Sequence, residues 1–125
     1  MQLSPDTSRA ANVVASYSAT EIRLRDRVVT TSAIITAERV LPWPVASVAS
    51  LSPELLEPVL GLGVDVVLLG VAGPQQWPAP AVLAAAAGRR IGLEIMELGA
   101  ACRTYNLLVG DRRPVALAAI LQGAS

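Results

Sequence analysis

Polar and apolar residues alternate along residues 20–28. A period of two is typical of a β-strand with one face in solvent. Residues 28–36 are rich in β-branched side chains, and the Asp26–Arg27 pair before them can form a tight reversal. The pattern therefore predicts an N-terminal β-hairpin, followed by a further extended segment at residues 39–41.

Apolar runs and helical signals alternate along the rest of the chain. Residues 65–71, DVVLLGV, form the continuous apolar run expected of a central strand covered on both faces. Further strands are expected at residues 91–96 and 115–121. Helices are expected after Ser52, which can cap the first turn, and then at two further places, residues 80–88 and 101–109. In the second of these helices, the side chains predicted to face inward are Val82, Leu83, Ala86 and Ala87.

Together these elements predict one α/β domain. A strand, a helix and a strand within about 30 residues form a βαβ unit, which requires parallel strands. We predict a three-layer fold, in which helices flank a mixed central sheet and the N-terminal β-hairpin is added to it. Residues 1–15 are expected to be a disordered lead, and residues 16–122 the single α/β domain.

Composition removes several kinds of chemistry. The chain has no histidine, its ten basic residues are all arginine, and it has one cysteine. Histidine-dependent triads and dyads, lysine nucleophiles and histidine-ligated zinc are therefore excluded, and we predict no metal and no cofactor. One cysteine forms no intrachain disulfide, which favours a reducing compartment. Since residues 1–12 also lack the apolar core of a signal peptide, we expect a cytoplasmic bacterial protein.

Charge and hydropathy argue against two classes of partner. The formal net charge is zero, whereas nucleic-acid binding normally needs a concentrated basic surface. No apolar segment approaches the roughly 18 residues needed to cross a bilayer. We therefore predict no nucleic acid and no membrane span. The arginines that do cluster in the sequence are expected to lie on solvated edges of the fold. They are Arg23, Arg25, Arg27, Arg89, Arg90, Arg112 and Arg113.

The most reactive candidate follows the strand at residues 91–96. Cys102 and Arg103 are predicted within the first turn of a helix, where the helix dipole and the neighbouring guanidinium would favour a thiolate. Cys102 is therefore the candidate catalytic nucleophile. The alternative is a small side chain buried against the sheet, where cysteine is common.

Arg103 is also a candidate for binding an anion, in a cleft between the helix start and a glycine-bounded loop. The alternative is a structural contact of Arg103 with Glu94, with Glu97 or with a cluster of backbone carbonyl groups. Thr104 and Asn106 can bind either a ligand or loop backbone, since both side chains bond main-chain groups readily. The candidate ligand-binding residues of this cleft are Gly70, Gly73, Arg103, Thr104 and Asn106.

Trp77 is the candidate anchor for a protein partner. It lies in a predicted loop, and aromatic residues are enriched at the centres of interfaces. It can equally cover the domain as a lid. Trp43, between two prolines, is expected to pack under the hairpin, and Tyr105 is expected in the core with its hydroxyl bonded.

An ordered set of motifs resembles a known family. After the hairpin and Trp43 come an apolar strand with a glycine-bounded loop, EIME at residues 94–97, AACRTYN at residues 100–106 and RRPVA at residues 112–116. The pattern resembles the small α/β domain family that includes the mitochondrial NADH:ubiquinone oxidoreductase (complex I) assembly factor 3 and the adipogenesis-associated domain protein. The resemblance covers roughly residues 22–121. It implies a three-layer α/β fold and an assembly or protein-interaction role.

One departure concerns the loop after the central strand. Family members often carry Gly-Thr-Gly there, whereas this chain has Gly70, Val71, Ala72 and Gly73. Two functional hypotheses follow. The first is an interaction or assembly-factor-like module with a protein partner, whose hairpin edge also allows self-association. The second is a small enzyme or anion-ligand binder that uses Cys102 and Arg103 in a cleft beside the Gly70–Gly73 loop.

Overall fold

The computed structural model describes residues 11–74 and 76–123. A small antiparallel sheet contains the first three strands, β1 (Val14–Tyr17), β2 (Ile22–Leu24) and β3 (Val28–Val29). A central sheet contains β4 (Ala33–Ile35), β5 (Val40–Pro42), β6 (Val66–Val71), β7 (Gly92–Glu97) and β8 (Val115–Ile120). Its order is β5-β4-β8-β6-β7. Strands β7, β6 and β8 are parallel, whereas β4 pairs antiparallel with both β8 and β5.

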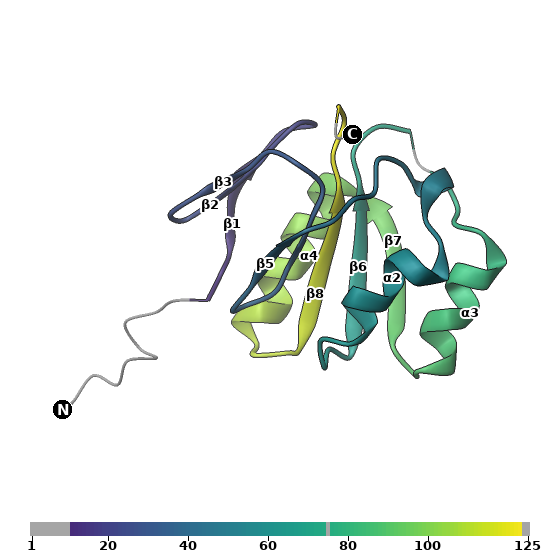
Figure 1. Ribbon diagram of the computed structural model, residues 1–125. Coiled ribbons are helices and arrows are strands. Elements are labelled where there is room, and N and C mark those ends of the chain that lie inside the picture. The colour runs from purple at the N-terminus through teal and green to yellow at the C-terminus, as the bar shows by residue number, and fades with distance from the viewer. Residues whose placement is uncertain (1–10, 75, 124–125) are drawn as a thin grey trace.

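The central sheet is covered on both faces (Figure 1). A short 3₁₀ turn η1 (Val48–Ser50), helix α2 (Pro53–Leu60) and helix α3 (Pro80–Gly88) lie on one face. Helix α4 (Leu98–Gly110) and the small sheet lie on the other. Side chains of β6 alternate between the two cores, since Val67 and Leu69 join the first and Leu68 the second. The predicted three-layer α/β fold with a mixed sheet and an N-terminal hairpin is confirmed.

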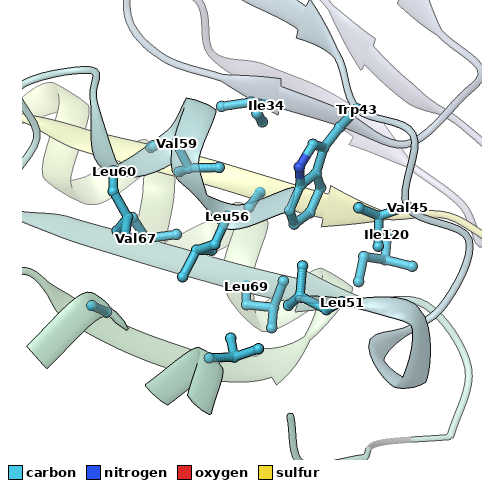
Figure 2. Close-up of a cluster of buried hydrophobic side chains, with 14 of the residues drawn as sticks. Ile34, Trp43, Val45, Leu51, Leu56, Val59, Leu60, Val67, Leu69 and Ile120 are labelled. Carbon is cyan, nitrogen blue, oxygen red and sulfur yellow. The ribbon is translucent and has the colours of Figure 1, made fainter. Parts of the chain in front are cut away.

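Local sequence signals explain the start of α2. Ser52 has extended backbone dihedrals, and its hydroxyl accepts a hydrogen bond from the amide of Leu55 at 3.2 Å. Pro53 follows at the first helical position, where an amide hydrogen would have no helical partner. The helix then places Leu56, Val59 and Leu60 against the sheet (Figure 2).

The N-terminal part of the chain differs from the prediction in two ways. Residues 28–36 do not form one strand, because the chain leaves the small sheet after Val29 and enters the central sheet at Ala33. Residues 1–10 lie outside the described part of the chain, but residues 11–15 of the predicted lead belong to the domain. Strand β1 begins at Val14, and the amide of Asn12 donates to the carbonyl of Ala37 at 2.8 Å.

Trp43 also lies elsewhere than predicted. Its indole is buried under α2, on the face of the central sheet opposite the hairpin (Figure 2). The indole Nε1 donates to the carbonyl of Leu55 at 2.7 Å. Because this bond satisfies the one polar group of the ring, Trp43 acts as a core residue that joins α2 to the strand region before it.

Candidate functional site

Gly70 lies in β6, directly beneath the first turns of α4. A Cβ atom at this position would be 2.7 Å from the Cβ of Ala101 and 3.3 Å from the Cδ1 of Leu98. Non-bonded carbons do not approach that closely, so the absence of a side chain lets the helix pack directly on the strand. Gly70, a predicted ligand-binding residue, therefore contributes to close helix–sheet packing.

Gly73 is the second predicted glycine of the cleft, and it adopts a backbone φ of +95°, which favours glycine. A Cβ here would be 2.5 Å from the Nε2 atom of Gln122. The side-chain amide of Gln122 therefore lies against Gly73 and fills the space beside it.

Cys102 is not in the first turn of its helix. Helix α4 begins at Leu98, so the thiol lies in the second turn and is only 2% exposed within the apolar cluster on that face of the sheet. Desolvation by burial, and then the negative charge of Glu97, raise the pKa of Cys102 to about 11, whereas Arg103 lowers it only weakly. The pKa shift is opposite to the predicted lowering, because the thiol is buried rather than at the positive helix end.

Arg103 points into solvent on the outside of α4. Its Nη2 lies 3.9 Å from the Oε1 of Glu97, and its Nη1 donates to the hydroxyl of Tyr17 at 3.4 Å. Glu97 is the N-cap of the helix and accepts a hydrogen bond from the amide of Ala100 at 2.7 Å. Bonds from the amides of Gly99 and Ala100 lower the pKa of Glu97. The amides that an external anion would need already bind a carboxylate.

The last predicted residues of the cleft face the N-terminal part of the chain. The Oδ1 of Asn106 accepts from the amide of Val14 at 2.9 Å, and its Nδ2 donates to the carbonyl of the same residue at 2.9 Å. The buried Tyr105 donates its hydroxyl to the carbonyl of Asn12 at 2.8 Å. Thr104 between them is half-buried. Asn106 thus attaches β1 to α4, and Tyr105 attaches the residues just before β1.

The structure does not bring the thiol and the guanidinium together in one accessible site. Cys102 lies under the helix, whereas Arg103 lies on its outer side. Within residues 11–74 and 76–123, no group of three or more histidine, cysteine or acidic residues is arranged to hold a metal ion. In the same part of the chain, every helix is too short or too polar to cross a bilayer.

Trp77 lies in the segment between β6 and α3 and is 74% exposed. The helix that follows presents more apolar surface than the sequence predicted. Val82 and Ala86 face the core as expected, but Leu83 and Ala87 are exposed, so their predicted inward orientation is wrong. Exposed apolar side chains thus occur both at Trp77 and on the outer side of α3, whereas Pro78 between them is buried.

A hollow that the sequence did not predict lies at the opposite end of the central sheet. The hollow has a volume of about 520 Å³, and its rim carries Arg39, Arg112 and Arg113. Its walls come from three turns that are far apart in the sequence. The antiparallel pairing of β4 with β8 brings two of them together. The Arg112–Arg113 pair was a visible signal, but the third arginine becomes its neighbour only through this pairing.

Comparison with known structures shows several close relatives. The Xanthomonas campestris protein XCC1710 has a TM-score of 0.87 and 35% identity, covering 100% of this chain and 96% of that chain. A protein from Bordetella parapertussis has a TM-score of 0.82 and 29% identity, covering 90% and 98%. A Mth938-like domain from Bordetella pertussis, with a TM-score of 0.79, 24% identity and coverage of 100% and 94%, shares the fold.

No protein of curated function matches the chain. The sequence model of a family described as protein of unknown function (DUF498/DUF598) matches residues 14–120. This match confirms the resemblance to the small α/β domain family inferred from the sequence, and the Mth938-like neighbours share its fold. The chain belongs to the DUF498/DUF598 family of proteins of unknown function.

Proposed function

We propose that this domain is a protein-interaction module, similar in kind to an assembly factor, and that Trp77 and the outer face of α3 bind its partner. The observation that carries the proposal is that this segment exposes several apolar side chains with no charged side chain among them. Residues 77–88 contain no charged side chain, and Trp77 at their start is 74% exposed.

Helix α3 is apolar on every side. Its inner side chains pack against the core, and the outer ones are exposed, namely Ala81, Leu83, Ala84 and Ala87. A surface helix normally carries charged or polar residues on its outer face, and a helix that is apolar all round is normally buried. Single exposed apolar residues need no explanation, but a run of them marks an interaction surface. We infer that a partner covers this face.

The chemistry of the surface favours a protein partner with an apolar groove. An uncharged segment offers nothing to attract phosphates or a strongly charged protein, whereas an exposed indole gains free energy by entering an apolar pocket. Trp77 is therefore the proposed anchor, and the small alanine side chains of α3 let the partner approach the helix backbone closely. We place the module in the cytoplasm, which agrees with the single thiol of Cys102.

The alternative, an enzyme or anion-ligand binder built on Cys102 and Arg103, has less support. It requires a thiolate near the surface, but burial raises the pKa of Cys102. It also requires free amides at the start of α4, but Glu97 binds them. We therefore rank the interaction module first.

Site-specific photo-crosslinking tests the proposal. A photoreactive amino acid is placed at position 77 or, as a control, at position 107, because Leu107 is 70% exposed on α4. After irradiation in cells of the native host, we expect a discrete cross-linked product from position 77 but not from position 107. Equal cross-linking from both positions, or none from position 77, would contradict the proposal.

Once the cross-linked protein is identified, its affinity tests the role of the indole. Truncating an anchor tryptophan costs about 2 kcal/mol or more, or roughly a 30-fold loss of affinity. We expect that loss for Trp77→Ala and no change for Leu107→Ala. If the product contains a second copy of this chain, light scattering should show a concentration-dependent dimer that Trp77→Ala abolishes.

A further inference from the structure

A hollow lies at the other end of the central sheet, away from Trp77. The hollow there has a volume of about 520 Å³, which falls in the range of small-molecule sites. Three segments line it, together with Ala11. They are residues 36–39, which join β4 to β5, residues 62–64 before β6, and residue 109 with residues 112–115, between the end of α4 and the start of β8.

The rim of the hollow is cationic and its floor is apolar. Arg39, Arg112 and Arg113 contribute three guanidinium groups, and Glu38 is the one acidic side chain of the lining. The buried apolar residues beneath them are Val64, Val109 and Val115. Ligand sites typically combine apolar walls with a few polar or charged groups that fix the orientation of the ligand.

These three guanidinium groups have no counter-ion in the described part of the chain. Arg23 pairs with Glu21, Arg89 with Glu57 and Arg103 with Glu97, whereas Arg25, Arg27 and Arg90 form no ion pair within the described residues either. Exposed arginines without a partner are ordinary when they are scattered. Three around one hollow create a local positive potential that attracts an anion.

A structural explanation for Arg112 and Arg113 would be that they satisfy the last carbonyl groups of α4, as cations near a helix C-terminus often do. Backbone amides already fill that role. The amide of Arg112 donates to the carbonyl of Val109 at 2.9 Å, and the amide of Arg113 donates to that of Leu108 at 2.8 Å. The amide of Asp111 donates to three carbonyls of the last turn. The two guanidinium groups therefore remain available.

We propose that this hollow binds a small organic anion with one acidic group. The carboxylate or phosphate is held by Arg39, Arg112 and Arg113, since the guanidinium fork matches both kinds of oxyanion. The apolar part of the ligand lies on Val64 and Val115. The carboxylate of Glu38 on the same rim repels further negative charge, so the site favours a singly acidic ligand over a polyanion.

Titrations with simple probes test this assignment in the full chain. Octanoate carries a carboxylate and octyl phosphate carries a phosphate, each on the same eight-carbon apolar tail. As controls, 1-octanol has the tail without a charge, and inorganic phosphate has the charge without a tail. We expect saturable chemical-shift changes with octanoate, octyl phosphate or both, at the backbone amides of residues 36–39, 63–64 and 112–113. The probe that binds more tightly, octanoate or octyl phosphate, identifies the acidic group that the site prefers. Binding of 1-octanol and of inorganic phosphate should each be at least tenfold weaker.

Variants separate the site from general charge effects. Arg112→Gln with Arg113→Gln should weaken binding of the preferred probe by at least tenfold, and Arg39→Gln alone should weaken it measurably. Arg90→Gln is the matched control, because Arg90 has φ 57° against 59° for Arg112 but does not line the hollow. The Arg90→Gln variant should bind the preferred probe with unchanged affinity.

Three results would overturn the proposal. They are equal binding of 1-octanol, unchanged affinity in both the double variant and Arg39→Gln, and shifts that are absent or map elsewhere. Dispersed amide spectra confirm that each variant is folded. If the double variant does not fold, Arg39→Gln alone still tests the role of the arginines.

Discussion

Replacing Asn106 by leucine should detach the small sheet from the rest of the domain. The carboxamide of Asn106 forms two hydrogen bonds of 2.9 Å with the amide and the carbonyl of Val14, in the manner of a neighbouring strand. Leucine keeps the size of the side chain but removes both bonds. Since Val14 is only 8% exposed, its backbone groups would then be poorly solvated.

The expected loss follows from these two bonds. Leaving one buried backbone group unsatisfied costs about 1–2 kcal/mol, so the loss of both should lower the free energy of unfolding by roughly 2–4 kcal/mol. That is a large share of the 5–15 kcal/mol that is typical of small domains. The bond from Tyr105 to Asn12 remains, so residues 11–13 stay attached and the loss falls on β1 and on the strands that pair with it.

Urea unfolding followed by circular dichroism measures the loss, and hydrogen exchange locates it. Exchange should accelerate in residues 14–24 and stay slow in β6. Leu107→Asn is the control, because Leu107 is the adjacent residue, is 70% exposed, and should tolerate the change within about 0.5 kcal/mol. A loss below about 0.5 kcal/mol for Asn106→Leu, or uniform acceleration of exchange, would refute the proposed attachment.

Three further predictions concern the core. Gly70→Ala should cost about 1–3 kcal/mol in urea unfolding, because its Cβ would lie 2.7 Å from that of Ala101, whereas Gly88→Ala, where a Cβ meets nothing within 4 Å, should be neutral or stabilising. Ser32→Ala should cost about 1–3 kcal/mol, because the hydroxyl of Ser32 accepts the buried amide of Leu121 at 3.0 Å; an unchanged urea midpoint would contradict this. The folded-state pKa of Cys102, about 11, lies above that of a free thiol, so the stability that the protonated thiol contributes is complete below about pH 8.5 and is lost as the pH rises toward 11. Cys102→Ala should remove the loss of stability that comes from this ionisation. Iodoacetamide at pH 8 should react far more slowly with the folded than with the urea-unfolded chain.

Strands and helices with strong local signals could be predicted from the sequence. The apolar run before Gly70 could hardly be anything but a covered strand, and Ser52 with the proline after it marks the start of α2. The start of α4 could not be placed in the same way. Glu97 is both the last residue of β7 and the N-cap of α4, so no loop or turn residue separates the two elements.

Features that depend on long-range contacts were beyond the sequence. Ser32 looks like an ordinary strand residue, but its bond to Leu121 lies where the chain passes from one sheet to the other. Trp43 reaches α2 rather than the hairpin, because the chain after β5 turns to the opposite face of the sheet. The rim of the hollow combines Arg39 with the Arg112–Arg113 pair only once β4 pairs with β8.

The two ends of the central sheet differ in a way that fold analogy alone would misjudge. Ligands of α/β sheets normally bind at the carboxyl ends of the parallel strands, which here is the end with Gly73 and the start of α4. The chain's own groups occupy that end, since Glu97 binds the first amides of the helix and Gln122 lies against Gly73. The opposite end carries guanidinium groups that lack counter-ions. The proposed anion site and the proposed partner surface at Trp77 and α3 are therefore assigned from the side chains rather than from the topology.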